Sequence, residues 1–321
     1  MVDAEVVRDA VELACRAPSL HNSQPWRWTA DAGRLHLRLD GTRVMPSADR
    51  GGREALISCG AALDHLRVAL AAAGWRTDVE RFPNPADPEH LASIDITPAR
   101  SVTDAQRRLA GAIPMRRTDR LPLGEPSDWD RTEAVLRTLV DGGLHLDVLS
   151  GDARARLAEA STLTEALRLY DSPYHAELGW WTAPIQTEEG IPYSSLVSES
   201  ESERVDVGRS FPATGHSRRR AGLDEDRATV VVLSTDRGAH DAAVSAGEAL
   251  SRILLECTAT GLATCTVTHV TELAVGRAII ATLIDRDTFP QLLIRIGVAP
   301  PLEKVAVPTP RRPLDDVLTF I

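Results

Sequence analysis

The chain almost lacks lysine. Of its 36 lysine and arginine residues, only Lys304 is a lysine. Motifs that require a lysine are therefore absent, namely the GxxxxGK[ST] phosphate loop, the VAIK strand of kinases and the SxxK acyl-enzyme site. The remaining positive charge resides on planar guanidinium groups, which favour bidentate recognition of phosphate and carboxylate groups.

Other common signals are also missing. The first turns of the chain are charged, so there is no apolar core of a signal peptide, and no apolar run approaches the length of a membrane span. The four cysteines form no CxxC pair, and the histidines show no HExxH spacing, so no metal site is predicted. A net charge of −10 disfavours non-specific binding to nucleic acid or to membranes. These absences predict a cytoplasmic protein.

A length of 321 residues corresponds to about two domains or one large domain. Apolar periodicity predicts both helices and short strands along the chain. The expected helices are 3–17, 53–74, 130–140, 152–181, 240–260 and 270–283. The expected strands are 35–39, 92–96, 145–149, 230–233 and 291–297. This alternation predicts an α+β fold of the three-layer α/β type.

Two long helical segments resemble each other. GAALDHLRVALAAAGW at 60–75 and GEALSRILLECTATGL at 247–262 align without gaps on glycine, alanine, leucine and a final glycine. Matches among such common residues are weak by themselves. Because each segment is a long helix with the same cap, one in each half of the chain, the sequence suggests two related halves.

Residues 184–227 lack periodicity and are interrupted by proline and glycine. A stretch of this length is uncommon in a compact domain and is either disordered or a functional lid. Its charged runs suit a solvated loop, whereas its apolar residues could anchor it to the rest of the protein. These candidate anchors are Ile185, Ile191, Tyr193, Leu196, Val197 and Phe211.

Three short segments are rich in groups that bind polar ligands. APSLHNSQPW at 17–26 holds hydroxyl and amide groups between two prolines, although such residues also form ordinary capped loops. RRTDR at 116–120 combines three guanidiniums with a hydroxyl and suits a phosphate dianion, or else is a solvated charge run paired with Asp119. TPRRP at 309–313 holds two arginines between prolines and taken alone is typical of a surface.

Together these segments resemble the nitroreductase superfamily. APSLHNSQPW looks like its flavin-binding loop, RRTDR resembles the segment that grips the phosphate of FMN, and TPRRPLDDV resembles a basic C-terminal segment that closes over that phosphate. Strings along nearly the whole chain, such as ACRAPSLHNSQPWRW, RRTDRLP and GLATCT, are similar to the mycobacterial Acg proteins, a nitroreductase group with two family units fused in one chain.

The resemblance implies two fused nitroreductase-like units, at 1–110 and 111–321, with a lid insertion at 184–227. The first half carries PSLHNSQPW without an arginine segment before its helix, and the second half carries RRTDR without the loop. An intramolecular pseudo-dimer of this kind would complete one flavin site and would be a monomer. The resemblance also favours a lid over a disordered loop.

Carried over onto this chain, the resemblance implies a set of FMN-binding residues. They are Pro18, Ser19, His21, Asn22, Gln24 and Trp26 in the loop, Arg116, Arg117, Thr118 and Arg120 at the phosphate, Arg311 and Arg312 opposite, and Ala263, Thr264, Cys265 and Thr266 facing the ring. Cys265 is interpreted as a packing residue. The lysine that the family often places near the flavin has no counterpart in this chain, and no catalytic residue is identified.

Two functions follow from the resemblance. In the first, the protein is an FMN-dependent NAD(P)H nitroreductase with a covered flavin, which passes electrons to a small aromatic acceptor. In the second, it binds or sequesters FMN and turns over little with nicotinamide donors, because a lid obstructs the nicotinamide position.

Overall fold

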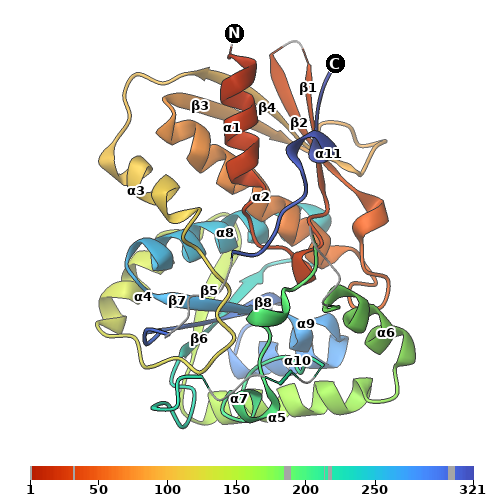
Figure 1. Ribbon diagram of the computed structural model, residues 1–321, viewed down its shortest axis with the longest axis vertical. Coiled ribbons are helices and arrows are strands. Elements are labelled where there is room, and N and C mark those ends of the chain that lie inside the picture. Colours follow the sequence, from red (N-terminus) through yellow and green to blue (C-terminus); the bar gives the residue numbers. More distant parts are fainter. Residues whose placement is uncertain (1, 32, 184–188, 213, 216–218, 303–307) are drawn as a thin grey trace.

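The computed structural model describes residues 2–31, 33–183, 189–212, 214–215, 219–302 and 308–321. Two sheets lie at opposite ends of the molecule, and two long helices, α2 (Arg53–Ala72) and α8 (His240–Ala259), lie between them (Figure 1). The two termini lie close together at the end that holds the first sheet (Figure 1). The α+β class expected from the sequence is therefore confirmed.

The first sheet has the strand order β3-β4-β2-β1-β9. Its strands are β1 (Trp26–Asp31), β2 (Arg34–Leu39), β3 (Trp75–Arg81), β4 (His90–Pro98) and β9 (Leu318–Phe320). The first four pair antiparallel, whereas β9 comes from the end of the chain and pairs parallel with β1. The helices of this end are α1 (Ala4–Ala14), α2 (Arg53–Ala72), α3 (Asp104–Ala112) and α11 (Leu314–Val317).

The second sheet has the strand order β5-β6-β8-β7 and is antiparallel throughout. Its strands are β5 (Leu144–Leu149), β6 (Thr229–Thr235), β7 (Ala263–Val267) and β8 (Phe289–Gly297). The associated helices are α4 (Trp129–Arg137), α5 (Asp152–Arg168), α8 (His240–Ala259), α9 (His269–Glu272) and α10 (Ala274–Leu283). Alternate residues of β6 face opposite cores, since Val231 belongs to the central core and Val232 to the core near α5 and α10.

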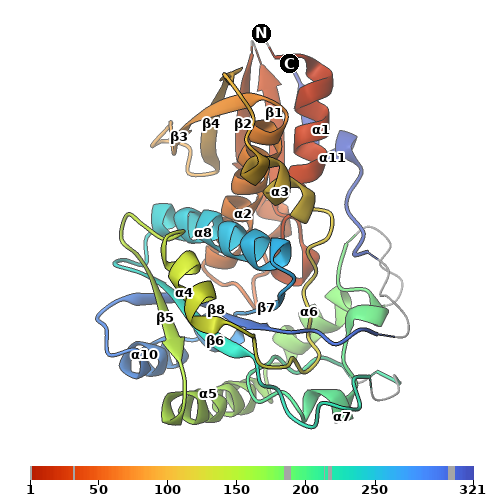
Figure 2. The ribbon, with the colours of Figure 1, turned by 90° about the vertical axis from the view of Figure 1, so that its left-hand side faces the viewer.

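The central core forms where α2 crosses α8 (Figure 2). Backbone meets backbone there: a Cβ atom on Gly60 would lie 2.0 Å from the carbonyl oxygen of Val244, and one on Gly247 would lie 2.0 Å from that of Ile57. Among the described residues, only α2 is long and apolar enough to span a membrane, but 78% of its apolar window is buried inside the protein.

This close approach predicts a large effect of a single methyl group. We expect Gly60→Ala to lower the free energy of unfolding by at least about 3 kcal/mol, because the two helices must separate to admit the new Cβ atom. Urea unfolding followed by circular dichroism measures the change. Gly111→Ala, on α3, is the matched control: nothing lies within 4 Å of its Cβ position, so a gain of about 0.5–1 kcal/mol is expected. Equal effects of the two substitutions would contradict the close crossing.

Two of the helices expected from the sequence have different bounds in the structure. The helix expected over 152–181 is two helices, because Asp171 caps a new helix by accepting from the backbone N–H of Tyr174, and Pro173 occupies its first turn. This second helix is α6 (Ser172–Trp181). The helix expected at 270–283 begins only at Ala274, after the short α9.

The long connection between β5 and β6 contains α5 and α6 and then the insertion, residues 184–227. The insertion holds a 3₁₀ turn at Tyr193–Ser195 and α7 (Glu199–Ser202). Of the expected apolar anchors, Ile191, Leu196 and Val197 are buried, and Tyr193 is exposed. The described part of 184–227 is thus packed against the protein. Ile185 lies outside the described residues.

Arginine side chains fasten this insertion. Arg204 donates to the backbone carbonyls of Arg219 and Leu223, and these bonds join two stretches of the insertion. Arg219 pairs with the buried Glu201 at 2.7 Å, and Arg220 pairs with Asp119 at 2.6 Å. The ion pair to Asp119 joins the insertion to the RRTDR segment, so the insertion is held by charge as well as by its apolar anchors.

Candidate functional site

Two adjoining cavities lie between the first half, the second half and the insertion. The first encloses about 960 Å³ of space and the second about 1310 Å³, in each case including space open to solvent. Four residues line both cavities, which therefore adjoin: Pro18, Ser19, Thr118 and Arg120. A ligand with a ring at one end and a charged group at the other could therefore occupy both.

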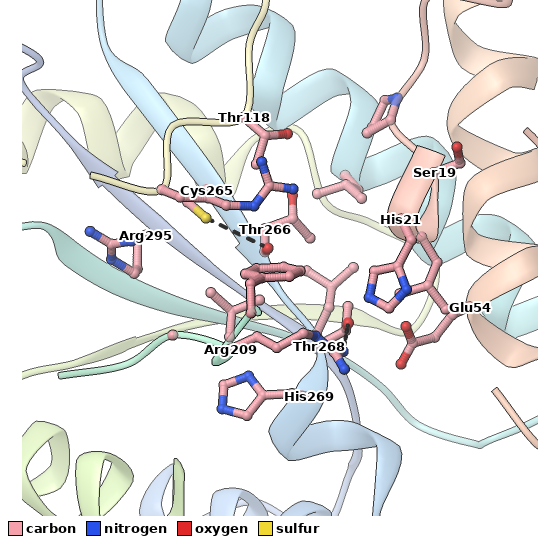
Figure 3. A pocket seen from close by; sticks show the side chains of 18 of the residues that line it. Ser19, His21, Glu54, Thr118, Arg209, Cys265, Thr266, Thr268, His269 and Arg295 are labelled. Carbon is pink, nitrogen blue, oxygen red and sulfur yellow. Dashed lines mark hydrogen bonds between the residues drawn. The ribbon is translucent and has the colours of Figure 1, made fainter. Parts of the chain in front are cut away.

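The first cavity is built from three parts of the chain (Figure 3). The loop that follows α1 and the first turns of α2 form one wall, through residues such as His21, Glu54 and Ser58. The strand β7 and the residues that follow it form the opposite wall, from Cys265 to His269. The insertion contributes Arg209, Phe211 and several apolar groups.

The loop after α1 is held in an unusual backbone conformation. His21, Asn22 and Gln24 all have positive φ, at 47°, 62° and 51°. Such values are uncommon for residues other than glycine and each costs of the order of 1–3 kcal/mol, so surrounding contacts must enforce them. The hydroxyl of Ser19 accepts from the backbone N–H of Gln24 at 3.0 Å, and the Asn22 amide donates to the carbonyl of Pro310 at 3.2 Å.

Besides Arg120, which lines both cavities, four arginines line the second cavity without a carboxylate partner among the described residues: Arg16, Arg116, Arg117 and Arg311. Burial, and then the neighbouring cations, lower the pKa of Arg116 to about 10. The same causes lower the pKa of Arg311 to about 9, with Arg116 the foremost of its neighbours. The buried Nε atom of Arg116 has no hydrogen-bond partner. Mutual repulsion and an orphaned donor both favour a bound anion.

Phe211 lines the first cavity. Its ring meets the imidazole of His21 edge-on, with 6.2 Å between centroids, and lies 5.2 Å from the guanidinium carbon of Arg120. Its neighbour in the insertion, Arg209, pairs with Glu272 and donates to the hydroxyl of Tyr174. The insertion thus extends an aromatic side chain into the cavity from an anchored backbone.

Glu54 is an acid in the wall of the first cavity. Burial, and then the nearby carboxylate of Glu272, raise the pKa of Glu54 to about 8, so this side chain is mostly neutral at pH 7. One carboxyl oxygen accepts from Arg53 at 3.1 Å, and the other is buried without a partner. Figure 3 shows Glu54 beside His21, with both side chains at the cavity.

This chain is similar along its length to proteins of Mycobacterium tuberculosis. A Mycobacterium tuberculosis protein named "Putative NAD(P)H nitroreductase acg" is 55% identical over 318 residues, which is 99% of this chain and 96% of the relative. The chain belongs to the Acg family. An uncharacterized protein of the same organism, Rv3127, is 50% identical over 98% of this chain and 92% of its own length. No family model matches the chain.

Solved structures resemble this Acg family member more distantly. An FMN-dependent nitroreductase of Mycobacterium smegmatis, crystallised with NADPH, is 18% identical, covers 68% of this chain and all of its own, and has a TM-score of 0.42. A nitroreductase of Bacteroides fragilis with bound FMN is 14% identical, covers 62% of this chain and 94% of its own, and has a TM-score of 0.38. Because these TM-scores are low, the arrangement of the site rests on the described residues of this chain.

Most of the site residues expected from the sequence lie at the two cavities. They are Pro18, Ser19, His21, Asn22, Arg116, Arg117, Thr118, Arg120, Cys265, Thr266 and Arg311. Within the described part of the chain, the others lie outside both walls. Gln24 is buried and accepts from the backbone N–H of Arg312 at 2.9 Å, while the Arg312 side chain reaches Asp40 at 3.6 Å, so these residues join the loop to the C-terminal segment.

Trp26 is fully buried in β1 and packs in the central core. Ala263 and Thr264 belong to β7, so the ring-facing segment that was expected as a loop is a strand, with only Cys265 and Thr266 of the four at the cavity. The thiol of Cys265 is buried, which raises its pKa, in agreement with a packing role.

Sequence reasoning missed three residues of the site. Arg16 directly precedes the recognised loop and adds a guanidinium to the second cavity. Glu54 occupies the first turn of α2, where an acid is ordinarily explained by the helix dipole. Arg209 lies in the aperiodic insertion, and no local pattern indicates that it reaches the cavity.

Proposed function

We propose that this protein binds one FMN across the two cavities and acts as an NAD(P)H-dependent nitroreductase-type oxidoreductase with a covered flavin. The phosphate would lie among Arg16, Arg116, Arg117 and Arg311, and the planar ring would lie in the first cavity. The family supports the proposal, because the Mycobacterium tuberculosis relative is named as an NAD(P)H nitroreductase. Bound FMN would supply the hydride chemistry, which no side chain can supply.

One observation carries this proposal. Four guanidiniums with no described carboxylate partner converge on one cavity of a protein whose net charge is −10. Arginines elsewhere in the chain commonly pair with an acid, as Arg34 does with Asp95 and Arg295 with Asp226. A cluster left unpaired beside a second, ring-sized cavity fits a phosphate dianion attached to a planar group.

The two-unit organisation is part of the proposal. The first four strands of the first sheet and the four of the second follow the same order when taken from β3 and from β7: β3-β4-β2-β1 and β7-β8-β6-β5. The helix contacts are reciprocal as well, since Gly60 meets Val244 and Gly247 meets Ile57. Such contacts are the signature of an isologous interface, here formed within one chain.

We place the units at 1–110 and 111–321, with α3 spanning the junction and β9 returning to the first sheet. The loop at the cavities comes from the first unit, and the RRTDR segment comes from the second. Each unit supplies what the other lacks, so one site per chain is expected. The insertion would be the lid, because its residues Val197, Arg209 and Phe211 line the first cavity.

The experiment that tests the function uses the purified protein. We expect a yellow protein whose visible spectrum shows bound flavin at about one FMN per chain and which is a monomer by light scattering. Reconstitution of apoprotein with FMN, followed by a titration to saturation, gives the stoichiometry. A colourless protein that also fails to bind added FMN would refute the proposal, and a ratio of two or an obligate homodimer would refute the one-site organisation.

A further inference from the structure

The start of α2 and the loop after α1 present a polar patch to the first cavity. Glu54 and His21 form it: Glu54 is 3% exposed and His21 is 6% exposed. Both ring nitrogens of His21 and one carboxyl oxygen of Glu54 are buried with no hydrogen-bond partner in the described structure. Each unsatisfied buried polar atom costs about 1–3 kcal/mol, so three in one wall indicate a ligand that completes them.

We propose that Glu54 and His21 form a subsite that hydrogen-bonds a carbonyl oxygen of a planar ring in the first cavity, with Glu54 as the donor. The ring is either that of the flavin or that of a quinone-like acceptor, which share this chemistry. The inference rests on the proposed function only for the class of ligand, a planar ring with a carbonyl group. The burial and the unpaired atoms of Glu54 and His21 are observed in this chain and do not depend on that function.

The surroundings of Glu54 fix the orientation of its carboxyl group. Arg53 donates to one carboxyl oxygen at 3.1 Å and is itself held by the backbone carbonyl of Thr271 at 3.2 Å and by Gln291. The guanidinium of Arg53 is therefore anchored to α9 and β8 and cannot turn to serve the second oxygen. That oxygen is left to face the cavity.

The charges near Glu54 keep it protonated. Glu272, on α9, is a neighbouring carboxylate that competes with Glu54 for cations. It pairs with the two other cations of this region, Arg168 at 3.1 Å and Arg209. Asp49, which precedes α2, adds further negative charge, although its own carboxyl is capped by the backbone N–H of Ala55 at 2.8 Å. Although Arg53 donates to one oxygen of Glu54, Arg168 and Arg209 are committed to Glu272, so Glu54 carries a proton at neutral pH and can donate a hydrogen bond from its other oxygen.

His21 completes the subsite as a neutral imidazole. Burial, and then the positive charges of Arg209 and Arg120, hold its pKa well below the ordinary value. A neutral ring offers one N–H donor and one acceptor nitrogen. Together with the Glu54 hydroxyl, these groups match a carbonyl oxygen next to a ring N–H or a second carbonyl.

The test compares Glu54→Gln and Glu54→Leu with the wild-type chain at about pH 7 and about pH 9.5. Apoprotein is titrated with FMN by flavin fluorescence, and holoprotein is titrated with 2-methyl-1,4-naphthoquinone by calorimetry. Loss of the donor is expected to weaken binding about tenfold, in Glu54→Leu at both pH values and in the wild type only at the higher pH. Glu54→Gln keeps an N–H donor and cannot ionise, so its affinity should not change with pH.

Asp64→Asn is the matched control, because Asp64 is another buried carboxyl on α2 with a raised pKa, about 6, and it lies away from the first cavity. The titration that responds identifies the ring: a change with FMN assigns the subsite to the flavin, and a change with the quinone alone assigns it to the acceptor. Infrared difference spectra should also show a protonated carboxyl band that is missing in Glu54→Gln and shifts when the ring binds.

Unchanged affinity of both variants for both probes would overturn the inference, as would a carboxylate band in place of the protonated one at pH 7. If wild-type apoprotein fails to bind FMN, the proposed function fails, whereas titration of the apoprotein with the quinone and the infrared band still decide the role of Glu54. Circular dichroism of each variant shows whether it has folded.

Discussion

Replacing both Arg116 and Arg311 by alanine is expected to yield a protein that purifies almost free of FMN. Hydrogen bonds to charged groups contribute about 1.5–3 kcal/mol each, so loss of two should weaken FMN binding by about 10²–10⁴-fold. The two guanidiniums line the same cavity, and their mutual repulsion shows that no described acid neutralises them. Titration of the apoprotein with FMN measures the effect.

Riboflavin separates this cause from general damage to the site. It has the same ring and lacks the phosphate, so its affinity should be nearly the same in the double variant and in the wild type. Arg131→Ala/Arg156→Ala removes the same charge from two exposed positions and should bind FMN normally. A double variant of Arg116 and Arg311 that remains fully loaded with FMN would show that the phosphate lies elsewhere.

Substitution of Phe211 by alanine is expected to accelerate the reduction of bound flavin by NADPH at least about tenfold. In the wild type, reduction should be slow, because the ring of Phe211 lines the cavity in which a nicotinamide would have to stack and narrows the space for it. The contact with Arg120 at 5.2 Å adds to the cost of moving this ring aside. Each 1.4 kcal/mol of opening cost lowers the competent fraction about tenfold. Anaerobic stopped-flow mixing with excess NADPH measures the rate.

The matched control is Tyr170→Ala, an aromatic side chain that is 91% exposed at the junction of α5 and α6. It should leave the rate unchanged. Replacing 186–222 by a short Gly/Ser linker removes the whole cover and should accelerate reduction further. Rapid bleaching of the wild-type flavin at the first mixing would contradict the lid.

The sequence predicted those parts of the fold that follow from local periodicity. The apolar stripes of α2 and α8 were clear, and their shared pattern suggested two related halves, but it did not reveal that Gly60 and Gly247 lie where the two helices cross. The break between α5 and α6 was missed, because Asp171 and Pro173 act through capping while the apolar pattern continues across them. The strand β7 was taken for a loop, because it is only five residues long and the resemblance implied a loop there.

The site was predicted as far as contiguous motifs reach. RRTDR and the loop at 18–24 supply most of the residues at the cavities. Arg312 and Gln24 were expected to touch the ligand, yet they bond to each other across 288 residues of chain, a pairing that neither motif reveals. The protonation of Glu54 depends on Glu272 and on Arg168 and Arg209, which come from distant parts of the chain, so only the folded arrangement could show it.

The parallel pairing of β9 with β1 has a consequence for the time course of folding. The first sheet emerges early during synthesis, but its edge beside β1 remains open until the last residues of this sequence have been made. Arg311 lies just before β9, so the guanidinium that it contributes to the second cavity is added at the same late stage of synthesis. A growing chain therefore cannot hold a phosphate tightly, and contacts this distant along the chain form slowly. Capture of the cofactor should therefore follow the synthesis of β9.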